Sequence, residues 1–309
     1  MQTVHGCSSL GVPYVTNAAL SGSLSGSRKR TPSSFPLIAY DFRIYSMKRR
    51  RIQLDAGQFP EAVLRLIRDA TVYDSSCSQA ARVYYIEREG GLFLKTAPAG
   101  SLGAEQAMTA YFHSRGLSAE VLLYTTAGDR DYMVTRRVPG EDCTDAACLA
   151  DPKRLCDTTA RLLRELHELD AADCPVGDRM AGYAECVRRG LTAGSYEPDL
   201  FAGLWEFDSP EAARQAARAG LPLLQSEALI HGDYCLPNII LRDWRLSGYI
   251  DLGGAGLGDR HIDVLWGVWT LKYNLGTARY TARFLDAYGR DRVEPDKLRQ
   301  IAAMEMISD

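Results

Sequence analysis

The sequence predicts an α+β fold in two lobes: a small, antiparallel, β-rich lobe with one inserted helix, followed by a larger, mainly helical lobe. Short β-prone runs separated by turn residues dominate the chain up to about residue 138. After Pro139 and Gly140, apolar residues recur at helical spacing instead. We therefore expect a leader over residues 1–51, a first lobe over 52–138 and a second lobe over 139–309.

Local patterns predict each element of the small lobe. Apolar residues at helical spacing predict a first helix. Two β-prone runs separated by Glu-Gly-Gly predict a hairpin, a helix follows, and two more strands flank the turn Ala-Gly-Asp-Arg. The expected helix, two strands, helix and two strands lie at residues 59–70, 82–87, 91–96, 101–115, 120–125 and 131–138.

In the larger lobe, an apolar stripe with charged residues on the opposite face predicts an amphipathic helix. The stripe consists of Leu155, Thr159, Leu162, Leu163, Leu166 and Leu169. Further helices are expected at residues 180–190, 209–219, 260–273, 277–289 and 295–307. Two short strands, at residues 238–241 and 246–251, interrupt these helices as a hairpin.

Composition excludes several classes of protein. No run approaches the length of about 18 apolar residues that a membrane-spanning helix needs. The first 27 residues lack the compact apolar stretch of a secretory signal, so we expect a cytoplasmic protein without a membrane partner. Eight scattered cysteines without a Cys-x-x-Cys pair indicate reduced thiols rather than a zinc site or a disulfide framework.

Charge is distributed unevenly along the chain. Residues 1–51 hold eight Lys or Arg and one acid, and we expect this leader to be disordered or to be a translated upstream extension. Because the whole chain has a net charge of −3, the remainder is near −10. Such a charge disfavours nucleic acid as a partner and is compatible with a cationic substrate, whereas composition leaves the oligomeric state open.

The residues that carry chemistry lie in the stretch from His231 to Asn238 and in the hairpin that ends at Asp251. An Asp in a loop and an Asn five positions later, where a strand begins, can both point into one cleft. The hairpin then brings a second carboxylate back to the same cleft. Phosphoryl transfer from a nucleotide needs one carboxylate to take the proton of the acceptor hydroxyl, and an amide oxygen and another carboxylate to hold Mg²⁺. We predict the first role for Asp233 and the second for Asn238 and Asp251.

His-Gly-Asp-x-x-x-x-Asn followed by Ile-Asp-Leu-Gly resembles the catalytic core of the aminoglycoside phosphotransferases, which are relatives of the protein kinases. The segments 170–175, 204–206 and 258–263 are most similar to the 3′-phosphotransferases, and the resemblance runs from about residue 55 to the end. It implies a bilobal, protein-kinase-like fold. It also implies transfer of the γ-phosphoryl group of ATP or GTP, with Mg²⁺, to the 3′-hydroxyl of a polycationic aminoglycoside antibiotic, which confers resistance.

The resemblance assigns further residues to the phosphates of the nucleotide. Lys95, on the second hairpin strand, would neutralise the phosphates, and Glu105, on the next helix, would fix the long Lys95 side chain. No Gly-x-Gly-x-x-Gly precedes the first hairpin strand. A small polar loop that contains Ser78 stands in its place, and its N–H and hydroxyl groups could cradle phosphates.

Three other residues are candidates for the base of the nucleotide. Phe93 lies two positions before Lys95, on the same strand face, where it either stacks on the base, as the resemblance implies, or fills the core of the lobe. The backbone groups of Arg136 to Val138 would form the hinge that bonds the purine edge. Because the sequence does not reveal backbone contacts, the choice between ATP and GTP stays open.

Carboxylates are the expected substrate contacts, because the ammonium groups of a polycation must be paired when they leave water. The candidates, each of which could equally be a solvated surface acid, are Glu206, Asp208, Glu305 and Asp309. The resemblance implies a structural role for His231 and Asp263, which would brace the catalytic loop by hydrogen bonds.

Two alternatives use the same fold. A kinase of a metabolic alcohol such as choline, homoserine or a sugar would phosphorylate that compound and not kanamycin. A pseudokinase would bind nucleotide and regulate a partner, but the set formed by Lys95, Glu105, Asp233, Asn238 and Asp251 is intact, which argues against it.

Overall fold

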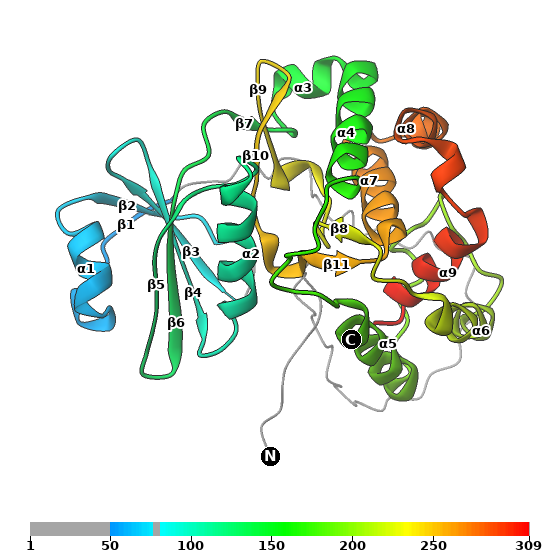
Figure 1. Cartoon of the computed structure of the whole chain (residues 1–309), viewed down its shortest axis with the longest axis horizontal. Coiled ribbons are helices and arrows are strands. Elements are labelled where there is room, and N and C mark those ends of the chain that lie inside the picture. The colour runs from blue at the N-terminus through cyan, green and yellow to red at the C-terminus, as the bar shows by residue number, and fades with distance from the viewer. Residues whose placement is uncertain (1–49, 77–80, 309) are drawn as a thin grey trace, which may run out of the picture.

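The computed structural model of the chain describes residues 50–76 and 81–308. A sheet with two helices forms one part of the molecule, and a larger, mainly helical part lies beside it (Figure 1). The expected position of Ser78 falls outside the described residues. Arg50 and Arg51, which the sequence analysis assigned to the leader, belong to a first short strand.

The small part is a six-stranded sheet in the order β1-β2-β3-β4-β6-β5, and every neighbouring pair is antiparallel. Its strands are β1 (Arg50–Ile52), β2 (Thr71–Asp74), β3 (Arg82–Glu87), β4 (Leu92–Pro98), β5 (Val121–Ala127) and β6 (Arg130–Arg136). The helices of this part are α1 (Glu61–Ile67) and α2 (Gly103–Ser114). The two predicted strand pairs and both helices are confirmed; β1 and β2 are additions that the sequence patterns did not predict.

The period of two in β4 determines which side chains face the helical part. Leu92 and Leu94 are buried in the apolar cluster under α1, together with Val63 and Ile86. Because successive strand residues point to opposite faces, Lys95 and its neighbour two positions earlier lie on the other face, toward α2. The alternation thus places a cation on the side of the sheet that the helical part approaches (Figure 1).

The helical part surrounds one large core. Its helices are α3 (Ala146–Ala150), α4 (Pro152–His167), α5 (Met180–Ala193), α6 (Pro210–Gly220), α7 (Arg260–Leu275), α8 (Thr281–Tyr288) and α9 (Pro295–Glu305). Its short 3-10 helices are η2 (Leu221–Leu223), η3 (Leu236–Asn238), η4 (Leu252–Gly254), η5 (Ala278–Tyr280) and η6 (Arg290–Arg292), and one more, η1 (Ala56–Gln58), precedes α1 in the small part. The predicted stripe is buried on α4 except at Leu169, which lies after the helix and is 38% exposed.

Five short strands lie in the helical part. β10 (Arg245–Tyr249), β9 (Ile239–Arg242) and β7 (Glu141–Asp142) form one sheet, and β8 (Ala228–Ile230) pairs with β11 (Gly256–Gly258). The hairpin of β9 and β10 was predicted, but β7, β8 and β11 were not. Because β8 leads into the segment 231–238 and β11 follows the segment 250–255, their pairing brings the two predicted functional loops to the same place.

The two parts are joined next to these loops. The backbone N–H of Tyr249 donates to the carbonyl of Leu117 at 2.7 Å, and the Ser118 hydroxyl donates to the carbonyl of Tyr249 at 2.8 Å. The segment that follows α2 is therefore tied to the end of β10, two residues before Asp251. Among the described residues, no helix has both the length and the apolar character needed to cross a membrane.

Candidate active site

The two functional loops touch through their glycines. Gly232 has a φ of +79°, and a Cβ atom built on it would lie 2.2 Å from the carbonyl oxygen of Gly254. Only glycine meets both conditions, since it tolerates positive φ and has no side chain. The His-Gly-Asp loop can therefore lie directly against the turn that follows Asp251.

We expect Gly232→Ala to lower the free energy of unfolding by about 2–4 kcal/mol, because it adds left-handed strain and a backbone overlap. Gly182 is the matched control: it is an exposed glycine of α5, and a Cβ atom added there would have no heavy atom within 4 Å. Gly182→Ala should raise stability by about 0.5–1 kcal/mol, since alanine favours helix. Urea unfolding of both variants measures the contrast, and equal effects would contradict the close approach.

Asp263 of α7 holds the start of the catalytic loop. Its carboxylate accepts hydrogen bonds from the backbone N–H groups of His231 at 2.6 Å and Gly232 at 2.8 Å. The His231 ring donates from Nε2 to the carbonyl of Ile250 at 3.0 Å, and its Nδ1 faces the N–H of Asp233 at 3.3 Å. Asp263 and His231 thus connect the catalytic loop to α7 and to the residue that precedes Asp251.

The carboxylate of Asp233 has one occupied and one open oxygen. Its Oδ2 accepts a hydrogen bond from Nδ2 of Asn238 at 3.0 Å, whereas its buried Oδ1 has no hydrogen-bond partner within the described residues. Burial, reinforced by the charge of Asp251, raises the pKa of the Asp233 carboxyl. A buried acceptor without a partner is costly, so Oδ1 is the atom that an incoming hydroxyl would satisfy.

The raised pKa of Asp233 has a consequence for stability against pH. Between the ordinary carboxyl pKa of about 4 and the higher value in the folded protein, the unfolded chain loses this proton and the folded chain keeps it. Folding therefore becomes less favourable as pH rises through this window. We expect Asp233→Asn to gain stability relative to the wild type with rising pH, up to a plateau, in urea unfolding at several pH values. A pH-independent difference would contradict the assigned shift.

Lys95 is the centre of an ion cluster that spans the two parts. Its Nζ lies 2.8 Å from both carboxylate oxygens of Glu105 on α2 and 2.8 Å from Oδ1 of Asp251. Desolvation would lower the pKa of Lys95, but the Asp251 and Glu105 carboxylates outweigh it and raise the pKa. For the Asp251 carboxyl, desolvation acts in the opposite direction and would raise the pKa, yet the Lys95 ammonium holds this pKa below its ordinary value. Burial raises the pKa of the Glu105 carboxyl, against the opposing effect of the Lys95 ammonium, so the charged form is favoured most clearly for Lys95 and Asp251.

A small apolar cluster contains one of the candidate hinge residues. Val138, Ala119 and Ile240 are buried together, and Ile250, the residue before Asp251, packs against them.

Phe93 packs against Tyr85, with the ring centroids 5.3 Å apart. Arg136 is exposed and ion-paired with Glu120 at 2.8 Å. Its backbone N–H donates to the Glu120 carbonyl at 3.0 Å, so this group is already used within the protein. The hinge role of the backbone groups from Arg136 to Val138 stays a prediction.

The four candidate substrate acids differ in position. Glu305 ends α9; burial raises the pKa of its carboxyl to about 7, and the nearby charge of Asp233 adds to this effect. Glu206 and Asp208 are exposed in the loop before α6, where Glu206 accepts a hydrogen bond from the N–H of Gly203 at 3.0 Å. Asp309 lies outside the described residues. Of the three described acids, Glu305 is the one whose pKa responds to the charge of Asp233.

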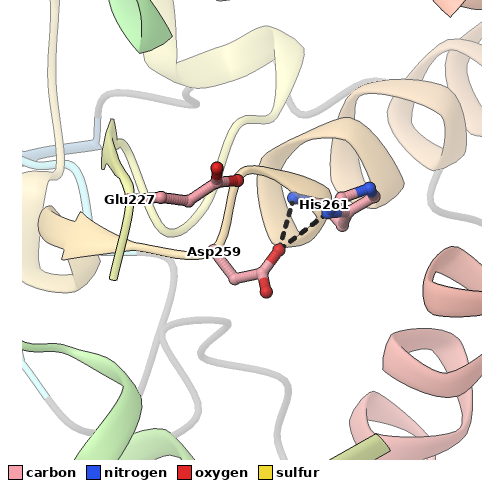
Figure 2. A group of neighbouring side chains, drawn as sticks. All are labelled: Glu227, Asp259 and His261. Atoms are coloured by element: carbon pink, nitrogen blue, oxygen red, sulfur yellow. Dashed lines mark hydrogen bonds and ion pairs between the residues drawn. The ribbon is translucent and has the colours of Figure 1, made fainter. Parts of the chain in front are cut away.

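A second group of possible metal ligands is found at the base of α7, where Glu227, Asp259 and His261 converge (Figure 2). Asp259 accepts from His261 Nδ1 at 2.8 Å and pairs with the buried Lys297 ammonium at 2.7 Å. His261 Nε2 accepts from the N–H of Glu294 at 3.0 Å. Because the protein already uses both ring nitrogens, this group is a structural anchor for α9 rather than a metal site.

The oxygen atoms near Asp233 fit a magnesium ion better. Asn238 uses its Nδ2 for the carboxylate and carbonyl of Asp233, which leaves its amide oxygen as a candidate ligand. Asp251 adds an ionised carboxylate, held in the left-handed region at a φ of +59°. An amide oxygen and a carboxylate are oxygen ligands of the kind that Mg²⁺ takes.

Comparisons with known proteins show the family to which the chain belongs. A model of the phosphotransferase enzyme family matches residues 76–301. A probable aminoglycoside 3′-phosphotransferase of Lactococcus lactis is 40% identical over 257 residues, which are 83% of this chain and 98% of that protein.

Solved structures share the fold. A crystal structure of an aminoglycoside-3′-phosphotransferase of type VIII has a TM-score of 0.60 at 26% identity, over 76% of this chain and 91% of that chain. The structure of an aminoglycoside phosphotransferase from Streptomyces rimosus, which holds ADP and streptomycin, has a TM-score of 0.57 at 21% identity, over 72% and 90% of the two chains. The predicted fold class is confirmed, and the chain belongs to the phosphotransferase enzyme family.

Proposed function

We propose that this chain is an aminoglycoside 3′-phosphotransferase, which transfers the γ-phosphoryl group of ATP or GTP to the 3′-hydroxyl of an aminoglycoside and so confers resistance. The observation that carries the proposal is the open, buried Oδ1 of Asp233 beside the ion cluster of Lys95, Glu105 and Asp251. The name and the 40% identity of the Lactococcus lactis relative support the choice of acceptor.

In this proposal, Asp233 orients the acceptor hydroxyl and takes its proton on Oδ1. A bond forms between the acceptor oxygen and the γ-phosphorus, and the bond from that phosphorus to the β,γ-bridging oxygen breaks, which releases the nucleoside diphosphate. The high pKa of Asp233 suits a group that must accept a proton. Asn238 stabilises the ionised carboxylate through its amide N–H and so holds Oδ1 in place.

Nucleotide would bind between the sheet and the helical part. Lys95 would neutralise the phosphates, with Glu105 holding its side chain, and Mg²⁺ held by Asn238 and Asp251 would supply further positive charge there. Val138 and Phe93 would contact the base.

We also propose a cytoplasmic location, because the reaction needs nucleoside triphosphate and none of the six described cysteines forms a disulfide.

We take Glu305 as the substrate carboxylate, because its charge interacts with that of Asp233 and so adds negative charge near the reacting hydroxyl. Glu305→Gln should raise the aminoglycoside KM by about tenfold with little change in kcat, because the lost ion pair contributes to binding. In the wild type, kcat/KM should fall as pH drops below about 7, where Glu305 becomes protonated in the free enzyme.

Initial rates at several pH values test this prediction. Glu211→Gln, which removes an exposed acid on α6, is the matched control and should leave KM unchanged. The acidic fall in kcat/KM near pH 7 should be absent in Glu305→Gln. If kcat/KM of Glu305→Gln still falls near pH 7, a group other than Glu305 is responsible for the titration.

A coupled assay of nucleoside diphosphate release tests the function as a whole. We expect turnover with kanamycin and related aminoglycosides, and none with choline or homoserine, using the wild type with Mg²⁺ and ATP or GTP. Turnover only with choline or homoserine would overturn the proposed acceptor in favour of a metabolic alcohol kinase. Nucleotide binding without turnover on any acceptor would indicate a pseudokinase.

A further inference from the structure

The side chain of Arg179 binds the loop that follows Asp251. Arg179 lies immediately before α5, and its guanidinium donates from Nε to the carbonyl of Ala255 at 2.7 Å and from Nη2 to the carbonyl of Gly253 at 2.6 Å. These two carbonyls flank Gly254, the residue that touches the catalytic loop at Gly232. A single side chain thus spans the contact between the two functional loops.

The loop needs such support because its own sequence is permissive. Three of the five residues after Asp251 are glycines, and Gly256 has a φ of +152° that other residues rarely adopt. Asp251 itself has a φ of +59°, an uncommon conformation for a residue with a side chain. Within the loop, one backbone hydrogen bond, from Ala255 to Leu252 at 3.1 Å, closes the turn.

Arg179 itself is anchored by its backbone. Its N–H donates to the carbonyl of Leu257 in β11 at 2.9 Å, and the N–H of Leu257 donates to the carbonyl of Val176 at 2.8 Å. The neighbouring Asp178 carboxylate accepts from the N–H of Met180 at 2.8 Å and from the Ser226 hydroxyl at 2.7 Å. The guanidinium therefore extends from a segment fixed to β11 and to the start of α5.

We propose that Arg179 is a positioning residue for magnesium binding: by holding the carbonyls of Gly253 and Ala255, it keeps the Asp251 carboxylate beside Asn238. This inference rests on the proposed function, in which Asp251 and Asn238 hold Mg²⁺. The planar guanidinium can reach two carbonyls at once, whereas a lysine ammonium is a single point of contact. Groups that orient metal ligands commonly change metal affinity about 10–100-fold when they are removed.

The test compares ADP binding with and without Mg²⁺ by isothermal titration calorimetry in the wild type, Arg179→Ala and Arg179→Lys. We expect Arg179→Ala to raise the Mg²⁺ concentration needed for tight ADP binding by about 10–100-fold, and to leave metal-free ADP affinity unchanged. Arg179→Lys should need a Mg²⁺ concentration between those of the wild type and Arg179→Ala. Arg188→Ala, which removes an exposed arginine of α5, is the control and should behave as the wild type.

The outcomes separate this inference from the proposed function. If the wild type binds ADP without any dependence on Mg²⁺, the proposed function is wrong. If the wild type shows the dependence and Arg179→Ala shows it equally, only the role of Arg179 is wrong. An equal loss of metal-free and magnesium-dependent affinity would also overturn it, as a purely structural effect. If thermal melting shows that Arg179→Ala does not fold, Arg179→Lys decides the question. A higher Mg²⁺ requirement than that of the wild type then supports the role of Arg179, and an equal requirement overturns it.

Discussion

Asp233→Asn should lower kcat by about 10²–10⁴-fold, because an amide cannot accept the proton of the acceptor hydroxyl. The substitution keeps the shape of the side chain and its place beside Asn238. Affinity for ADP with Mg²⁺ should stay within about twofold, since the proposed metal ligands are Asn238 and Asp251. Initial rates with kanamycin and calorimetric titration with ADP measure the two effects.

Asp286→Asn is the control for this experiment, because Asp286 is an exposed acid of α8 that pairs only with Arg290 among the described residues. It should leave both kcat and ADP affinity unchanged. Unchanged turnover in Asp233→Asn would remove Asp233 from the role of base, and a large loss of ADP affinity would place it among the nucleotide contacts instead.

Asp251→Ala should abolish magnesium-dependent turnover, with a fall in kcat/KM of at least about 10³-fold, because Mg²⁺ and the phosphates lose their carboxylate. Lys95 would keep its bond to Glu105, so the small lobe should remain folded. Loss of the ion pair with Lys95, and the φ of +59° that alanine adopts less readily than aspartate, should lower the melting temperature, so thermal melting checks that the variant is folded at the assay temperature. Rates across a range of Mg²⁺ concentrations test the prediction.

Turnover that Asp251→Ala recovers at high Mg²⁺ would indicate a weakened site with Asp251 as one ligand. Retained turnover at ordinary Mg²⁺ would contradict the assignment of the metal to Asp251. Glu227→Gln is a useful comparison, because Glu227 belongs to the group with Asp259 and His261 at the base of α7, which the described residues offer as a second set of possible metal ligands (Figure 2). That variant should keep its magnesium dependence.

Local sequence patterns predicted the parts of the fold that local interactions determine. The hairpin of β3 and β4 and the amphipathic α4 have clear periods of two and of about 3.6 residues. The strands β8 and β11 have three residues each, which is too short for any period to appear. Their pairing depends on contacts between distant parts of the chain, so only the structure shows why the two functional loops meet.

The same distinction applies to the candidate site. The motif that contains Asp233, Asn238 and Asp251 could be read from residue types and spacing, and the structure places Lys95 against Asp251. Arg179 carries no comparable signal, because its bonds to backbone carbonyls depend on a loop that is 74 residues away in the chain. The occupied N–H of Arg136 was likewise invisible, since its acceptor is a carbonyl on a neighbouring segment.

A crystal structure of the wild type with Mg²⁺, a non-hydrolysable ATP analogue and kanamycin tests the central claim most directly. The account predicts one ion bound by the amide oxygen of Asn238 and the carboxylate of Asp251, with the 3′-hydroxyl within hydrogen-bond distance of Asp233 Oδ1. A structure in which the ion binds away from both residues, or in which no hydroxyl of the antibiotic reaches Asp233, would contradict it.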